Sequence, residues 1–175
     1  MKAMKQTAAR GWLRPSLLDR LTDHEPQRAR EPAEAQGVDD AQLRLLVRRD
    51  LAWLLNTTHL ATGVDLGEFP EVARSVLNYG VPDLTGRTLS SVDSSQLERQ
   101  IAQGLMQYES RLVRETIRVR VTSAPNDAGR PTLFVEVAAV LRTEPLPVGL
   151  RVRAEVDVES GRVVIGEDMF EQEES

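Results

Sequence analysis

The fold is decided by one stretch, Ser95-Gln-Leu-Glu-Arg-Gln-Ile-Ala-Gln-Gly-Leu-Met-Gln-Tyr108, and by the residues that follow it to Val121. The first part predicts an amphipathic helix, because its apolar side chains recur at helical spacing and form one stripe. Residues 117–122 then alternate between apolar and polar side chains, which predicts a half-buried strand. Ser95 and Glu98 have the spacing of a capping box, so we expect Glu98 to cap the first turn of this helix.

The junction between the predicted helix and the predicted strand carries a charge of the unfavourable sign. Glu109 follows the C-terminal end of the helix, where the helix dipole disfavours an anion by about 0.3–1 kcal/mol. We therefore expect a cation to offset it. Two sources remain open: Arg111 within the corner, or a basic group of a partner. The first is a structural ion pair that fixes the corner, whereas the second makes Tyr108, Glu109 and Arg111 candidate partner-binding residues.

Length and composition narrow the class of protein. The 175 residues suffice for one domain, and the absence of cysteine excludes a disulfide framework. The net charge of −5 is made of interspersed acids and bases, and aromatic residues are 4% of the chain, which argues against nucleic acid as a partner. No apolar run approaches the ~20 residues that span a bilayer. We expect a soluble, cytoplasmic protein without direct membrane insertion.

Composition divides the chain into three parts. Residues 1–40 are expected to form a basic N-terminal arm, a short apolar segment and a linker; residues 41–166 the folded domain; and residues 167–175 an acidic tail. The apolar segment is too short to be a stable helix alone, so it must rest on the domain or on another protein. It is a candidate partner-docking segment through four side chains: Trp12, Leu17, Leu18 and Leu21.

The order of the predicted elements indicates the fold class. Helices are expected at 41–55, 70–77 and 95–108, the first capped by Asp39 or Asp40, and Gly80 is suited to the positive φ that closes the second. Strands are expected at 114–122, 132–141, 150–158 and 162–165. This order predicts an α+β domain in which three helices pack on one face of a small, mainly antiparallel sheet of three to four strands.

No catalytic or metal-binding constellation is recognisable. The two histidines lack the spacing of metal ligands, and no phosphate-binding or nucleophile motif occurs. We therefore expect no enzyme activity, no catalytic residue, no metal and no cofactor. Two alternatives remain open: a peptidoglycan hydrolase (muramidase) that uses Glu109 as its acid, and a nucleic-acid-binding module that uses the arginine-rich faces.

Three segments resemble a known family: Pro15-Ser-Leu-Leu-Asp-Arg-Leu21, Val47-Arg-Arg-Asp-Leu-Ala-Trp-Leu-Leu-Asn56 and Pro70-Glu-Val-Ala-Arg-Ser-Val-Leu-Asn-Tyr-Gly-Val-Pro-Asp83. They are similar to the TssE family of bacterial type VI secretion baseplate subunits, within the family named after the phage T4 baseplate wedge "lysozyme". The resemblance covers about residues 12–165. A Glu-Pro-Arg triplet of that family is matched by Glu109-Ser110-Arg111, with the proline replaced.

The resemblance implies a structural baseplate role, at the secretion apparatus on the cytoplasmic side of the inner membrane. It implies TssF and TssG as wedge partners, TssK as a further candidate, and the contractile sheath proteins TssB and TssC. An open sheet edge could accept sheath strands, and the charged corner could anchor the domain to the wedge.

Overall fold

The structure of the chain is a computed structural model that describes residues 16–22, 27, 38–83, 93–125, 129, 131–143 and 146–166. Within these residues, four α-helices precede four strands: α1 (Leu17–Leu21), α2 (Asp40–Leu55), α3 (Pro70–Ala73), α4 (Ser94–Tyr108), β1 (Arg118–Pro125), β2 (Pro131–Leu141), β3 (Val148–Val156) and β4 (Val163–Ile165). The strands form one antiparallel sheet in the order β1-β2-β3-β4. The α+β fold class is confirmed.

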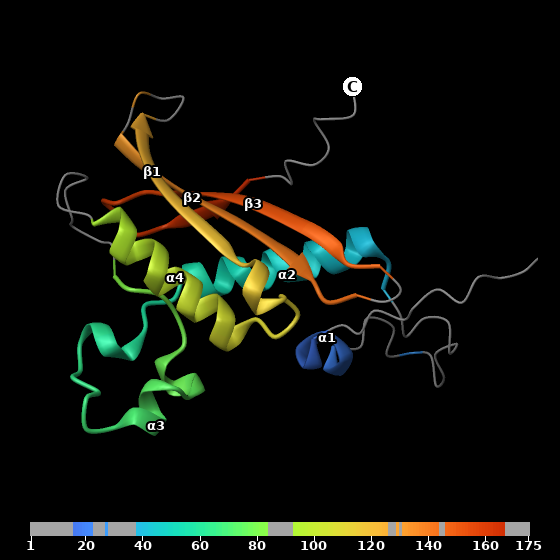
Figure 1. The fold of residues 1–175 in the computed structure, drawn as a ribbon, viewed down its shortest axis with the longest axis horizontal. Coiled ribbons are helices and arrows are strands. Elements are labelled where there is room, and N and C mark those ends of the chain that lie inside the picture. Colours follow the sequence, from blue (N-terminus) through green and yellow to red (C-terminus); the bar gives the residue numbers. More distant parts are fainter. Residues whose placement is uncertain are drawn as a thin grey trace, which may run out of the picture.

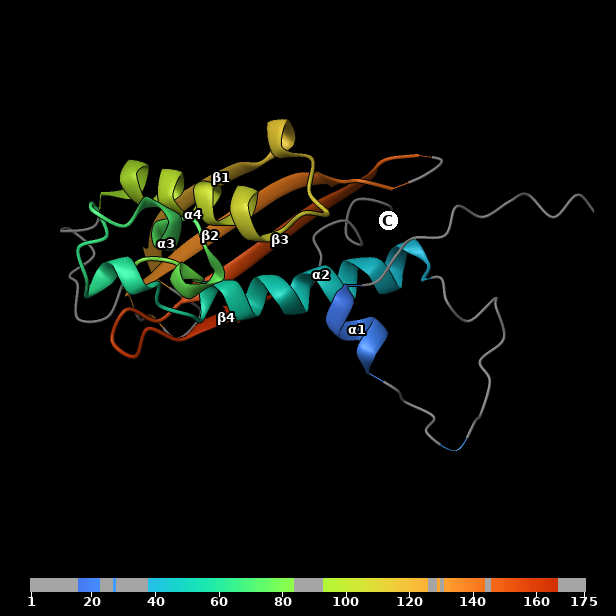
Figure 2. The ribbon, with the colours of Figure 1, turned by 90° about the horizontal axis from the view of Figure 1, so that it is seen from below.

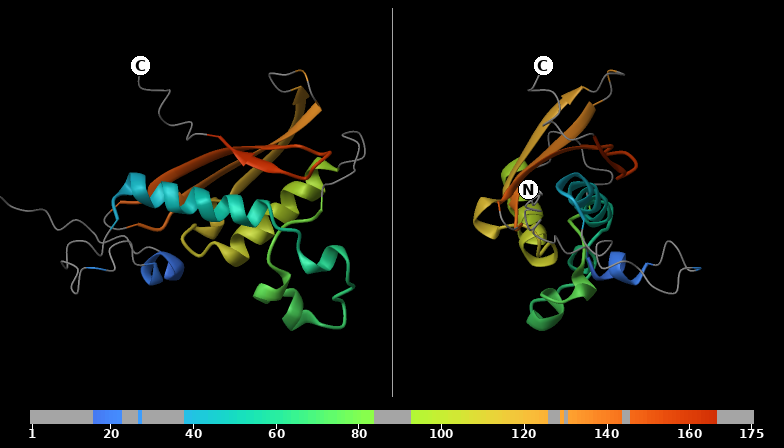
Figure 3. Two further views of the ribbon diagram at one scale, coloured as in Figure 1. Left: turned by 180° about the vertical axis from the view of Figure 1, so that it is seen from behind. Right: turned by 90° about the vertical axis from the view of Figure 1, so that its right-hand side faces the viewer.

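The helices lie on one side of the sheet (Figures 1 and 3). α2 contacts β3 and β4, whereas α4 contacts β1. α3 belongs to a lobe that projects from the body on this same side, beyond α4 (Figure 1). None of the helices in the described part of the chain is long and apolar enough to cross a membrane.

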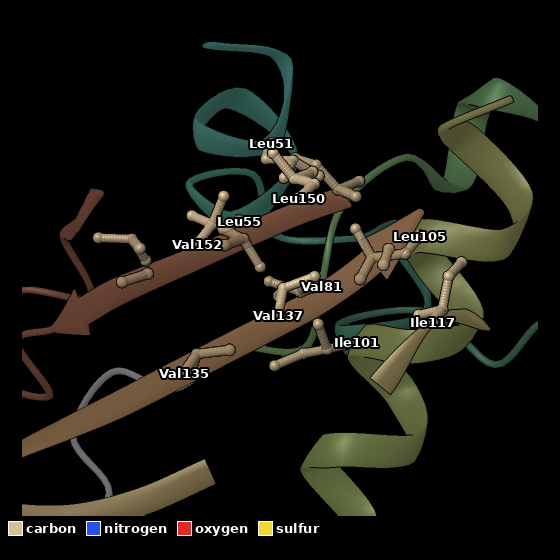
Figure 4. Packing of buried hydrophobic residues seen from close by; sticks show 14 of the residues in the cluster. Leu51, Leu55, Val81, Ile101, Leu105, Ile117, Val135, Val137, Leu150 and Val152 are labelled. Carbon is tan, nitrogen blue, oxygen red and sulfur yellow. The ribbon is translucent and has the colours of Figure 1, made fainter. Parts of the chain in front are cut away.

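The core fills the layer between the sheet and the two long helices. Leu51 and Leu55 of α2 and Ile101 and Leu105 of α4 are buried against the inner residues of the central strands (Figure 4). Each such side chain contributes about 1.5–3 kcal/mol when it leaves water. The strand residues that meet the helices are the alternating ones that the sequence predicts, among them Val135, Val137, Leu150 and Val152.

The two long helices begin with aspartate caps. The Asp39 carboxylate accepts a hydrogen bond from the Gln42 N–H at 2.7 Å, as predicted for the first of them. The second begins one residue earlier than expected, because Asp93 caps it through the Gln96 N–H at 3.0 Å. The predicted capping box of Ser95 and Glu98 is therefore wrong. With Asp93 as the cap, Glu98 lies beyond the first turn and is available for another contact.

The first strand starts four residues later than predicted. Residues Arg114–Thr116 form a 3₁₀ turn instead. The Thr116 hydroxyl donates to the Val113 carbonyl at 2.6 Å and accepts from the Val140 N–H at 2.9 Å. The Thr116 hydroxyl binds the Val140 N–H in place of the backbone carbonyl that a continuous strand would have supplied. The chain can therefore bend here and remain hydrogen-bonded to β2.

The lobe that contains α3 is fastened at its two ends. The Val81 N–H donates to the Thr57 carbonyl at 2.8 Å, and the His59 N–H donates to the Val81 carbonyl at 3.0 Å. Next to these bonds Gly80 has φ of 126°, which confirms the predicted positive φ, but the helix predicted at 70–77 is wrong: α3 ends at Ala73, a 3₁₀ turn follows at Val76–Asn78, and Gly80 closes neither of them. A Cβ at this position would lie 2.2 Å from the Thr57 carbonyl oxygen. Only glycine fits where the two segments cross.

Gly80→Ala is expected to destabilise the fold by about 1–3 kcal/mol, because it adds both the strain of a positive φ and a backbone clash. Gly63→Ala is the matched control, since a Cβ at Gly63 meets nothing within 4 Å. Urea denaturation followed by circular dichroism measures both variants. Equal stabilities for the two variants would contradict the close approach at Gly80.

Candidate functional site

The corner between α4 and the sheet is a tight turn held by backbone bonds. α4 ends at Tyr108, and the Glu109 N–H still donates to the Leu105 carbonyl at 3.0 Å. The Leu112 N–H donates to the Glu109 carbonyl at 3.3 Å, which closes a β-turn with Ser110 and Arg111 at its centre. No non-glycine residue among those described has positive φ, so the turn is of type I.

The turn is also bonded to the end of β2. The Arg142 N–H donates to the Arg111 carbonyl at 2.7 Å, and the Val113 N–H donates to the Val140 carbonyl at 2.9 Å. Leu112, between these bonds, is fully buried. The corner is therefore set by the sheet as well as by the helix that precedes it.

Arg111 is the cation that offsets Glu109. Its Nε donates to Glu109 Oε1 at 2.7 Å, its Nη2 bonds the second carboxylate oxygen, and its backbone N–H also donates to Oε1 at 3.0 Å. Glu109 is 7% exposed, so this bidentate pair lies largely out of water. Of the two sources left open by the sequence, the one within the chain is present.

A second carboxylate reaches the same guanidinium from α2. Arg111 Nη2 donates to Asp50 Oδ2 at 2.5 Å. Burial lowers the pKa of Arg111, but the hydrogen bonds and charges of Glu109 and Asp50 outweigh that effect and raise it. Arg111 Nη1 is buried without a hydrogen-bond partner in the part of the chain that the structure describes. The corner thus joins α4, the turn and α2 through one cation.

The charged cluster continues to α1, which lies beside α2 (Figure 2). Arg49 Nη2 donates to Asp50 Oδ1 at 2.7 Å, and Arg49 Nη1 bonds Asp19 Oδ1 at 2.6 Å. The Arg49 guanidinium also lies 4.6 Å from the centre of the Trp53 ring. Asp19 in turn forms a capping box with Ser16. Burial raises the pKa of Asp19, but the bonds and charge of Arg49 and the bonds from Ser16 outweigh it and lower that pKa.

The predicted docking segment is only partly described. Trp12 and the side chain of Leu17 lie outside the described residues. Leu18 and Leu21 are 52% and 74% exposed, although α1 is capped and paired to α2. The contact between α1 and the domain seen here is polar, and it leaves these two leucines facing solvent. Their role in docking a partner stays a prediction.

Tyr108 is engaged within the chain. Its hydroxyl lies 2.8 Å from the Asn78 carbonyl and 3.0 Å from the Ser75 carbonyl, and it accepts from Gln107 Nε2 at 2.9 Å. Its ring meets that of Tyr79 edge-on, with 5.1 Å between the ring centres. Burial raises the pKa of the Tyr108 phenol, although the bond from Gln107 acts in the opposite direction. Tyr108 therefore ties the lobe to the end of α4; whether it also binds a partner stays a prediction.

The family model of the baseplate wedge protein gp25 matches residues 41–146, from the start of α2 through the corner and past β2. The chain belongs to this family. Membership indicates a phage baseplate wedge-like protein, and confirms the family resemblance noted in the sequence over residues 41–146; the segment Pro15–Leu21 lies outside this match. Comparisons of the chain with curated proteins and with solved structures found no match.

In this member of the gp25 family, sequence reasoning missed the part of the corner that α2 supplies. Asp50 lies three residues after Val47 and four before Leu54, both buried, so it is an acid on the apolar stripe of its helix. That placement was the available signal, because a charge on a buried face needs a partner. The local pattern does not identify Arg111, 61 residues later, as that partner.

The corner does not have the arrangement of a glycosidase site. Glycosidic cleavage needs two carboxylates that face the substrate bond from either side. Here the two nearby carboxylates, Glu109 and Asp50, both face the Arg111 guanidinium, which lies between them. No group of three or more histidine, cysteine or acidic residues among those described could hold a metal ion. What the arrangement does chemically is to hold a buried charge network in place.

The two sides of the ion pair are expected to differ in their effect on stability. Arg111→Ala leaves a buried carboxylate without a cation and should cost about 3–5 kcal/mol. Glu109→Ala leaves Arg111 paired with Asp50 and should cost only about 1–3 kcal/mol. Arg114→Ala, an exposed neighbour, is the control and should change stability by no more than about 0.5 kcal/mol. Urea denaturation measures the free energy of unfolding of each variant. A larger loss of stability for Glu109→Ala than for Arg111→Ala would contradict the role of Asp50 as a second partner of Arg111.

Ser110→Pro, which restores the family triplet, is expected to stabilise the protein by about 0.4–1 kcal/mol. Ser110 is exposed and occupies the second position of a type I turn, where proline is favoured. Glu109, which precedes it, has ψ of 87°, so it is already outside the helical region that proline disfavours for the residue before it. Thermal unfolding compares the two proteins, and a lower midpoint for the proline variant would show that the turn differs from this description.

Proposed function

We propose that this protein is a structural baseplate component of a type VI secretion system. In this proposal it links the TssF/TssG wedge to the TssB–TssC sheath and starts sheath polymerisation by strand pairing. TssK is a further candidate partner, and the site of action is the cytoplasmic side of the inner-membrane secretion apparatus. The observation that carries the proposal is the gp25 family match, which spans α2, α3, α4, the corner and the first two strands.

The corner supports the wedge contact. The Arg111 side chain is 15% exposed, and within its own guanidinium Nη1 is the nitrogen that has no hydrogen-bond partner among the residues described. Because Nη1 is buried, a carbonyl or carboxylate of the wedge would contact the exposed part of this side chain, and a charge-assisted bond of that kind is stronger than a neutral one. Glu109 and Asp50 hold the guanidinium in one orientation, so little freedom is lost on binding.

The sheet supports the sheath contact. Its four strands form an open antiparallel ladder with β1 and β4 as the border strands. A border strand presents N–H and C=O groups to which an extended segment of another protein can add. Such addition needs no catalytic group and continues the same hydrogen-bond ladder, which suits a subunit that begins a polymer of sheet-forming proteins.

The Arg111→Lys variant tests the role of Arg111 in wedge binding separately from its role in folding. Lysine keeps the positive charge between Glu109 and Asp50 but loses the planar fork of donors, so the fold should persist while wedge binding weakens. We expect at least ten-fold less TssF–TssG to co-purify with this variant than with wild type, at unchanged circular dichroism. Arg114→Lys is the matched control on an exposed neighbour.

The same preparations test the sheath step. Wild-type protein bound to TssF–TssG should increase the amount of TssB–TssC that sediments as polymer, and the Arg111→Lys preparation should not. A folded Arg111→Lys protein that captures the wedge as well as wild type would remove the corner from the interface. A wild-type complex that neither captures the wedge nor promotes sheath assembly would refute the proposed function.

A further inference from the structure

One backbone group of the border strand β1 is bonded to a side chain of a helix. The Val121 N–H donates to Glu98 Oε1 at 2.8 Å, across 23 residues of sequence. Val121 lies opposite Val135 in the ladder with β2, and because its N–H binds Glu98, this is one of the pairs whose backbone groups point away from each other. The Glu98 carboxylate therefore occupies a hydrogen-bonding position on the outer edge of the sheet.

The direction of this one N–H determines which other groups lie on the same edge. In an antiparallel pair, the N–H and C=O of alternate residues point to the same side. The ladder between β1 and β2 is continuous from Arg118 to Pro125, so Val119 and Ser123 also direct their backbone groups outward. Glu98 binds the middle one of these three residues.

The two borders of the sheet differ in length. β4 has three residues and pairs only with Ala154–Val156, so that border is divided between β4 and residues 148–153 of β3, which α2 contacts; β1 instead presents eight residues in one continuous border strand. Pro125, which lacks an N–H, ends the usable part of β1. An added strand of ordinary length, about five residues, fits on β1 from Arg118 to Ala124.

We infer that β1 is the border that receives an extended strand of the partner, and that Glu98 occupies its central N–H until that strand arrives. This inference rests on the proposed function and names the edge at which it acts. An unprotected border strand pairs with any extended segment, including another copy of the same chain, and charged side chains at the edge are a common protection. Glu98 gives that protection from the helix that packs under β1, and its exposure is intermediate, so it can return to water when displaced.

The side chains of β1 indicate the chemistry of the incoming strand. Val119 and Val121, half-buried and buried, face the helices, whereas Arg118 and Arg120 are exposed on the opposite face. A strand that adds here extends both faces of the sheet. The best partner therefore alternates apolar residues toward α4 with acidic residues beside the two arginines, because opposite charges on neighbouring strands attract.

Without the Glu98 carboxylate, the outer edge of β1 should be free to pair with a second copy of this chain. Glu98→Ala is expected to tighten self-association at least ten-fold, measured by sedimentation velocity over a range of concentrations. Glu98→Gln keeps an acceptor oxygen in the same place and should stay near wild type. Glu68→Ala, which removes an exposed acid from the lobe, is the charge-matched control. Equal self-association of Glu98→Ala, Glu68→Ala and wild type would overturn the inference that Glu98 protects the edge of β1.

A second substitution tests whether β1 is the edge involved. Ser123→Pro removes an outward N–H and no bond to β2, so the strand itself should persist. The double variant Glu98→Ala/Ser123→Pro should return to the wild-type level of association, and undiminished association of this variant would overturn the inference. Ser123→Pro alone should also fail to promote sedimentation of TssB–TssC polymer. Full promotion by this variant would assign sheath pairing to another edge and leave the proposed function standing, whereas no promotion by wild type would refute that function.

Discussion

The structure depends on one guanidinium. Arg111 binds both oxygens of Glu109, which follows the end of α4, and one oxygen of Asp50 in α2, while its own backbone is bonded to the end of β2. Three elements therefore meet at a charge that is largely removed from water. A buried ion pair adds little net stability relative to apolar packing, but the loss of one partner is costly. Its physical effect is to define how α2, α4 and the sheet are arranged at the corner.

This arrangement leaves specific surfaces available. α2 and α4 cover one face of the sheet, and the apolar side chains of both helices are buried in the core beneath β2 and β3. The borders of the sheet are not covered by another strand within the described residues, and the backbone there keeps its capacity for hydrogen bonds. The function that we propose would use such a division: one buried charged joint that fixes geometry, and one extendable ladder at a distance from it.

Features that depend on near neighbours in the sequence could be predicted. The stripes of α2 and α4, the alternation in β2 and β3, the positive φ of Gly80 and Arg111 as one candidate partner of Glu109 all follow from residues a few positions apart. Errors arose where two local solutions competed. Asp93 and Ser95 are both good helix caps, and the choice of Asp93 freed Glu98 for β1. Thr116 could continue a strand or bend it, and its hydroxyl bonds favour the bend.

The sequence by itself determined the elements, the α+β class and the charged corner, because periodicity, capping and turn chemistry act over one or two turns of chain. Only the tertiary structure decided which distant groups meet: Asp50 with Arg111, Asp19 with Arg49, and Glu98 with the backbone of Val121. The residues next to a charged side chain in the sequence do not indicate which distant group will pair with it. Its partner is chosen when the helices pack on the sheet and exclude water, since an unpaired charge is then too costly to leave in place.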